Sequence, residues 1–179
     1  MRLYLMLAMF YILSKNNIEG KKFITLLNSV NCPEYPDVPY KMTSFKRSYN
    51  RKNQTVLREF EILEEVSPEG LISIIDVLKC QPSGAPDTCE YIMKNYKADF
   101  CEAMMAKGKP WSDLIETIEP KATCPLKVGH YRTEYALKEG GFTILPFPSG
   151  VYKVRFVVRN KEKMVWCLDN FTKVTSFAS

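Results

Sequence analysis

Side chains suited to acid–base or nucleophilic catalysis are scarce in this sequence. A Ser-His-Asp or Cys-His arrangement needs a histidine, and His130 is the one histidine among 179 residues. It stands at the start of a predicted strand, a place typical of a structural or exposed histidine. Glu64 and Glu65 are adjacent carboxylates, which in a strand point to opposite faces and cannot share a substrate. The sequence also contains no glycine-rich nucleotide-binding motif. We therefore predict that the protein is not an enzyme and binds no cofactor.

The cysteines favour disulfide bonds over a metal site. Zinc sites use close pairs such as C-x-x-C, or cysteine mixed with histidine, and neither pattern occurs here. An even number of cysteines in an exported protein predicts disulfides, and for six cysteines about fifteen pairings are possible. Two glycosylation sequons, at Asn53 and Asn170, agree with export and predict glycans there. The six cysteines are Cys32, Cys80, Cys89, Cys101, Cys124 and Cys167.

The N-terminal segment has the pattern of a secretory signal peptide. Its apolar run, Leu3–Leu13, is shorter than the roughly 20 residues that span a bilayer. A buried first strand or helix is the alternative interpretation of this run. We predict that residues 1–20 are a signal peptide, cut between residues 14 and 20, and that residues 21–179 form a single secreted, extracellular domain.

Alternation of apolar and polar residues predicts a mainly β fold. Leu71–Leu78 is apolar on both faces, which predicts a central strand. Val56–Val66 is expected to pair with it across a turn at residues 67–70. The predicted strands are Val38–Tyr49, Val56–Val66, Leu71–Leu78, Tyr131–Lys138, Tyr152–Arg159 and Lys163–Val174.

One stretch departs from the β pattern. Asp87–Ala106 is rich in helix formers, which predicts a helical insertion. Trp111–Ile118 is expected to add a helical turn that begins at Ser112. Together with the strands, these segments predict a β-sandwich or β-cup with a short helical insertion.

A proline-flanked apolar loop at residues 142–150 is the first candidate for ligand binding. Two interpretations remain open, a plug of the core and a hydrophobic lip at the mouth of a cavity. Prolines on both sides of Phe147 remove amide donors, which favours a segment crossing the rim over a paired strand. The large apolar side chains of the loop are Phe142, Ile144, Leu145 and Phe147.

A basic stretch between Asp37 and Glu59 is the second candidate. It is either a solvated hairpin or a site of attraction to anionic headgroups, which would allow transient contact with a membrane surface. Nucleic acid is excluded as a partner because an exported protein without stacking platforms does not suit it. The basic residues are Lys41, Lys46, Arg47, Arg51, Lys52 and Arg58.

Two sequence runs and the order of the cysteines resemble the ML-type lipid-recognition group. The runs are Cys124-Pro-Leu-Lys-Val-Gly-His-Tyr131 and Leu145-Pro-Phe-Pro-Ser-Gly-Val-Tyr152. They follow the spacing Cys80-x8-Cys89-x11-Cys101 and precede Cys167. Within the group the chain is similar to the ganglioside activator protein and closest to the insect chemosensory B proteins.

The resemblance implies a β-cup with an internal hydrophobic cavity and a particular set of disulfides. In such a cup, strand alternation puts Tyr135, Tyr152, Val154 and Phe156 on the inner wall, beside the loop at residues 142–150. The implied disulfides are Cys32–Cys167, Cys80–Cys89 and Cys101–Cys124.

The function that the resemblance implies is that of a secreted lipid-binding protein. It would carry or detect a hydrophobic ligand, such as a pheromone or cuticular lipid in chemosensation. The alternative is an accessory protein that presents a membrane lipid to a hydrolase. Ganglioside specificity does not follow, because Phe147 stands where the activator has tryptophan and the activator's fourth bridge is missing. Neither a receptor nor a hydrolase partner can be named, since fold does not fix the ligand.

Overall fold

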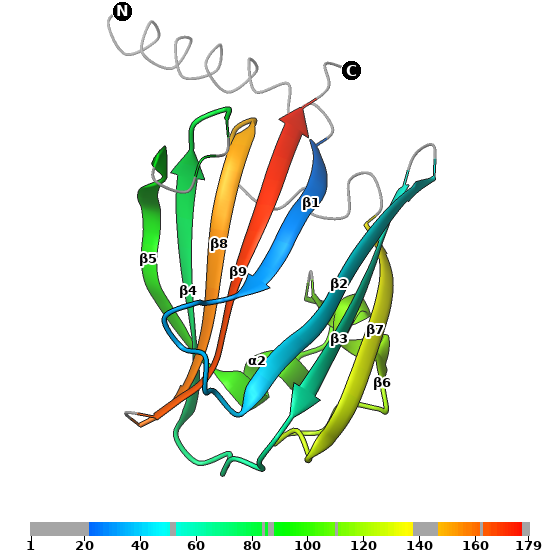
Figure 1. Cartoon of the computed structure of the whole chain (residues 1–179), viewed down its shortest axis with the longest axis vertical. Helices are drawn as coiled ribbons and strands as arrows, with labels where there is room; N and C mark the ends of the chain where they lie inside the picture. Colours follow the sequence, from blue (N-terminus) through cyan, green and yellow to red (C-terminus); the bar gives the residue numbers. More distant parts are fainter. Residues whose placement is uncertain are drawn as a thin grey trace, which may run out of the picture.

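The computed structural model describes residues 22–50, 53–83, 85, 88–109, 111–137, 147–161 and 163–176. These residues form two antiparallel sheets that face each other (Figure 1), which confirms the mainly β prediction. In hydrogen-bonding order, the first sheet contains β1 (Lys22–Asn31), β9 (Lys163–Ser176), β8 (Gly150–Asn160), β4 (Leu71–Cys80) and β5 (Glu90–Asp99). The second sheet contains β2 (Tyr40–Asn50), β3 (Asn53–Ile62), β7 (Gly129–Leu137) and β6 (Ile118–Glu119). The predicted signal peptide lies outside the described residues.

Most of the strands expected from alternation are present. The segments predicted from residues 38, 131, 152 and 163 onward correspond to β2, β7, β8 and β9. The central position expected for Leu71–Leu78 is confirmed, because β4 lies between β8 and β5. The sequence prediction missed β1, β5 and the short β6.

The predicted pairing of Val56–Val66 with Leu71–Leu78 is wrong. This segment forms β3, which ends at Ile62 and pairs with β2 and β7 in the second sheet. Residues 63–70 therefore carry the chain from one sheet to the other. Alternation identifies a strand and its two faces, but it does not identify the partner strand.

The predicted helix over Asp87–Ala106 is largely wrong. Its greater part is β5, which pairs with β4, and only α2 (Phe100–Met105) is helical. Asn95 has φ of 58°, a left-handed conformation that an α-helix does not accommodate, and its amide donates to Asp76 Oδ1 at 2.7 Å. The neighbouring strand supplies backbone partners that outweigh the local helix propensity.

A second short helix confirms the helical turn expected at residues 111–118. This is α3 (Ser112–Glu116), which follows α2 along the chain. Ser112 begins α3, but its hydroxyl donates to the carbonyl of Ala106 at 2.8 Å rather than capping the helix. Within the described residues, no helix has the length and apolar character needed to cross a bilayer.

The main core lies between the two sheets around α2. Inward side chains of both sheets pack against Phe100 and Met104 of α2. A helix this short is not stable by itself in water, so burial of its apolar side chains stabilises it. The most deeply buried members include Tyr40, Ile62, Leu71, Leu126, Val158 and Val165.

The disulfides have the pairing that the resemblance implied. Cys32–Cys167 joins the end of β1 to β9, Cys80–Cys89 closes the connection between β4 and β5, and Cys101–Cys124 ties α2 to the segment before β7. Cys32 and Cys167 pack with Val157 on the five-stranded sheet, so this bridge also belongs to a small apolar cluster.

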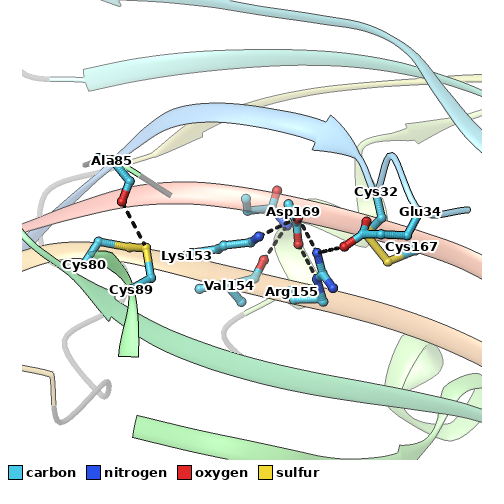
Figure 2. A network of polar contacts seen from close by, with 11 residues as sticks. Cys32, Glu34, Cys80, Ala85, Cys89, Lys153, Val154, Arg155, Cys167 and Asp169 are labelled. Atoms are coloured by element: carbon cyan, nitrogen blue, oxygen red, sulfur yellow. Dashed lines mark hydrogen bonds and ion pairs between the residues drawn. A yellow bond between two sulfur atoms is a disulfide. The ribbon is translucent and has the colours of Figure 1, made fainter. Parts of the chain in front are cut away.

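A charged network lies beside that disulfide (Figure 2). Asp169 is buried and accepts hydrogen bonds from Arg155 Nε at 2.7 Å and Nη2 at 2.9 Å. Lys153 Nζ lies 2.9 Å from the same carboxylate, and Arg155 reaches Glu34 at 3.0 Å. Burial alone would raise the pKa of Asp169, but the bonds from Arg155 and Lys153 hold this pKa below its usual value.

Candidate functional site

A large, mainly apolar cavity lies between the two sheets. Its volume is about 570 Å³, within the range of roughly 300–1,000 Å³ that small-molecule sites occupy. Both sheets, both helices and the segments between α2 and β7 contribute to its wall. The lining residues from the strands are Met42, Arg58, Phe60, Ser73, Ile75, Tyr96, Ala98, Asp99, Ile118, Thr133, Val154, Phe156, Trp166, Leu168 and Asn170. The helices and connecting segments add Phe100, Glu102, Ala103, Met104, Ala106, Lys109, Trp111, Leu114, Ile115 and Leu126.

The exposed members of the lining mark the mouth of the cavity. They are Tyr96 and Asp99 of β5, Glu102 of α2, and Lys109 and Trp111 in the segment between the helices. Tyr96 has 55% of its surface exposed and Trp111 has 38%, although both contribute to the cavity wall. The cavity therefore opens on the side formed by β5 and the two helices.

Hydrogen bonds hold the two helices together at this mouth. Trp111 Nε1 donates to the carbonyl of Ala103 in α2 at 2.7 Å. The Asp99 carboxylate accepts from the Glu102 amide at 2.7 Å and caps the N-terminus of α2. The disulfide Cys101–Cys124 links the same helix to the segment before β7. The helical part of the mouth is thus held in place by hydrogen bonds and by a disulfide.

Aromatic rings form one wall of the cavity. The Trp166 ring stacks on Phe60 at a centroid distance of 5.7 Å and meets Phe156 edge-on at 5.6 Å. Phe156 also contacts Phe100 of α2 at 6.5 Å. Such rings offer broad apolar surface with few rotatable bonds, which suits contact with a hydrocarbon ligand.

Polar groups enter the cavity at a bridge between the sheets. Arg58 of β3 donates from Nη2 to Asn170 Oδ1 of β9 at 2.7 Å, and Ser29 of β1 donates to the same oxygen at 2.8 Å. The guanidinium carbon of Arg58 lies 5.9 Å from the centre of the Tyr135 ring. Burial lowers the pKa of Arg58 and raises the pKa of Tyr135.

Two residues expected on the inner wall, Val154 and Phe156, do line the cavity. The other two, Tyr135 and Tyr152, pack elsewhere. Tyr135 joins Leu26, Val56 and Leu137 in a separate cluster. Tyr152 is almost fully buried among Val77 and Val174, and its hydroxyl donates to Pro148 O at 2.6 Å.

The apolar loop is described at Phe147 but not before it. Phe147 is half-buried and stacks on Tyr152 at a centroid distance of 5.4 Å, so it contacts the cluster beside the cavity and not the cavity wall. Phe142, Ile144 and Leu145 lie outside the described residues.

The two sequons differ in their surroundings. Asn53 is exposed at the start of β3. Asn170 lines the cavity, and its oxygen accepts from Arg58 and Ser29. Glycosylation at either position stays a prediction.

His130 stands apart from the cavity. Its side chain is 80% exposed and lies 3.5 Å from Glu61 across the strand pair β3–β7. Within the described residues, no group of three or more potential metal ligands is clustered. The chemistry that the cavity itself offers is apolar burial together with the polar bridge at Arg58.

Arg58 lies in the cavity wall, where the sequence prediction did not place it. The sequence pattern groups Arg58 with the basic stretch at the surface, but the residue shares the inner face of β3 with the buried Val56 and Phe60. Alternation along β3 could have predicted that Arg58 faces inward, because the residues two positions before and after it are apolar. Of the remaining basic residues, Lys46 and Arg47 are exposed, Lys41 is half-buried, and residues 51 and 52 lie outside the described residues.

Comparison with known proteins gives distant structural likenesses. No family model and no curated protein matches the sequence. The structure of chicken MD-1 complexed with lipid IVa has a TM-score of 0.39 and 14% identity, covering 89% of this chain and 99% of that chain. A Niemann-Pick type C2 protein from Japanese carpenter ant has a TM-score of 0.35 and 13% identity, covering 84% of this chain and 97% of that chain. Both likenesses are weak, and the resemblance to insect chemosensory B proteins stays a prediction.

Proposed function

We propose that this protein binds a lipid-like hydrophobic ligand in the cavity between its sheets. The observation that supports the proposal is the cavity itself, about 570 Å³ of space with a mainly apolar wall and a mouth at the surface. Protein interiors are normally packed at the density of organic crystals, so an apolar cavity of this size is suited to a ligand. Transfer of a hydrocarbon chain from water to this wall supplies the binding energy.

The proposed role is that of a secreted carrier or detector. The disulfides and the apolar N-terminal run support export, and export makes glycosylation at the exposed Asn53 the expected modification. The resemblance to the insect chemosensory B proteins supports a pheromone or cuticular lipid as cargo. Lys46 and Arg47 would favour transient contact with anionic membranes during uptake or delivery.

Presentation of a membrane lipid to a hydrolase is the second role within this proposal. The two roles differ in what the protein does at a bilayer. A presenting protein extracts a labelled lipid from vesicles and transfers it to the hydrolase. A carrier of a pheromone or cuticular lipid binds its ligand in the absence of vesicles. A vesicle-extraction assay therefore separates them.

Filling the cavity tests the proposed function. Ala98 of β5 lines the cavity, so Ala98→Phe puts a ring into the ligand space. We expect saturable binding of a fluorescent fatty acyl probe by the wild type and at least about tenfold weaker binding by this variant. Ala136→Phe is the matched control, because Ala136 is exposed on β7 and does not contribute to the cavity wall. Equal binding by all three proteins would refute ligand binding at this site.

A further inference from the structure

Arg58 occupies an unusual place for a charged side chain. Of the charged residues that the structure describes in the cavity wall, Asp99, Glu102 and Lys109 are exposed at the mouth, and only Arg58 lies inside. It comes from the middle of β3, directly between Val56 and Phe60 on the inner face. A cation in such a place is costly unless an opposite charge or a full set of hydrogen bonds accompanies it.

The protein satisfies only part of this guanidinium. One Nη group donates to Asn170, while Nε is inaccessible and has no hydrogen-bond partner among the described residues. The ion pairs formed within the described part of the chain do not include Arg58. Since arginine has five N–H donors and remains protonated, the cavity holds a positive charge without a protein counter-charge.

The contrast with Arg155 shows what a compensated arginine looks like in this fold. Arg155 bonds Asp169 through two nitrogens and also reaches Glu34. The same chain therefore pairs one half-buried arginine with two carboxylates and leaves the arginine of the cavity with a neutral amide and an aromatic ring. The second arrangement is suited to a counter-charge that arrives with the ligand.

The charges at the mouth favour one orientation of such a ligand. Asp99 and Glu102 place two carboxylates there against one cation, Lys109. An anionic headgroup left at the mouth would meet a net negative rim, whereas inside it would meet Arg58. Its hydrocarbon tail would then lie along the apolar and aromatic wall that includes Phe156 and Trp166.

We propose that Arg58 binds the carboxylate of a single-chain organic acid, held with its head inside the cavity and its tail against the apolar wall. This inference rests on the proposed function and narrows the class of ligand. A planar monocarboxylate matches the fork of the guanidinium and neutralises its single charge. A doubly charged phosphate would bring one negative charge more than Arg58 balances.

Matched ligands test the inference. A fluorescent polyene fatty acid and its methyl ester have the same tail, and only the acid carries a charge. We expect the wild type at neutral pH to bind the acid at least about tenfold more tightly than the ester. Arg58→Met should bring the ratio of the two dissociation constants close to one, and Arg58→Lys should retain part of the preference. Arg132→Met, on the exposed surface of β7, is the control and should keep the wild-type ratio.

The outcomes separate this inference from the proposed function. Equal affinity of the wild type for acid and ester would overturn the role of Arg58 and leave lipid binding intact. Binding of neither probe would overturn both. If a folded Arg58→Met variant keeps the full preference for the acid, a residue other than Arg58 binds the carboxylate of the ligand. If Arg58→Met does not fold, the acid-to-ester ratio in the wild type and in Arg58→Lys decides the matter.

Discussion

Arg58 and Arg155 show that the type of a residue does not by itself determine its role. Arg155 has its carboxylates within the protein, whereas Arg58 has an amide and an open cavity. Their roles follow from which face of a strand they occupy and from what lies opposite. We therefore interpret the ion pair between Arg155 and Asp169 as structural, and Arg58 as a residue that contacts the ligand.

Asp169 should contribute stability that depends on pH. Asp169→Asn leaves Lys153 and Arg155 without their buried carboxylate, and we expect a loss of about 2–3 kcal/mol in unfolding free energy at pH 7. Because the folded pKa of Asp169 lies below its usual value, its contribution is complete above the unfolded pKa of 3.8. It is lost as pH falls through the folded pKa, so the wild type and the variant should converge at strongly acidic pH. Chemical denaturation across pH measures this difference.

Glu34→Gln provides the comparison for that measurement. Glu34 is 51% exposed and pairs with Arg155 at the surface, so its removal should cost much less than the loss of Asp169. A difference between wild type and Asp169→Asn that stays constant down to the lowest pH would contradict the assignment.

The elements of the fold were predictable where one strand face is buried. Tyr152–Arg159 and Tyr131–Lys138 alternate clearly, and both are strands in the structure. β5 was missed because most of its residues are exposed at a sheet edge, which removes the apolar signal, and because its composition favours a helix. The cavity was implied by the family resemblance, but its wall includes α2 and α3, whose position between the sheets no local pattern specifies.

The pair α2–α3 lines the mouth of the cavity together with β5. Trp111→Phe keeps the ring at the mouth and removes the bond to the Ala103 carbonyl. Loss of one such bond corresponds to about a two- to tenfold change in rate, so we expect faster ligand release with little change in melting temperature. Stopped-flow dissociation of a bound fluorescent acyl probe measures it.

Tyr91→Phe is the control for that experiment. Tyr91 is exposed on β5 and does not contribute to the cavity wall. Release rates that are unchanged in Trp111→Phe would show that the contact between the two helices does not limit exit from the cavity.

At the scale of the whole molecule, the fold is two sheets held apart around an incompletely filled interior. A core with a large cavity gives up contacts that a packed core would have, and covalent links offset part of that loss. The Cys32–Cys167 bridge spans 135 residues and connects β1 to β9, whereas Cys80–Cys89 spans 9. Because Cys32–Cys167 closes the longer loop, we expect it to contribute more to the stability of the fold than Cys80–Cys89 does.

Removal of the two bridges should therefore differ in effect. The loop-entropy model assigns roughly 4–5 kcal/mol to a loop as long as that of Cys32–Cys167 and about 2–3 kcal/mol to the short one. We expect Cys32→Ala with Cys167→Ala to lower the melting temperature and secretion yield more than Cys80→Ala with Cys89→Ala. Equal losses in the two double variants would mean that the long bridge does not hold the sheet ends together.

The most direct test of ligand binding is native mass spectrometry of the protein purified from secreting cells without added lipid. We predict a protein peak carrying one small hydrophobic molecule, released as an organic acid on denaturation, and loss of that molecule in Ala98→Phe but not in Ala136→Phe. A wild-type spectrum that shows only the bare chain, from protein that also fails to take up any acyl probe, would contradict the account.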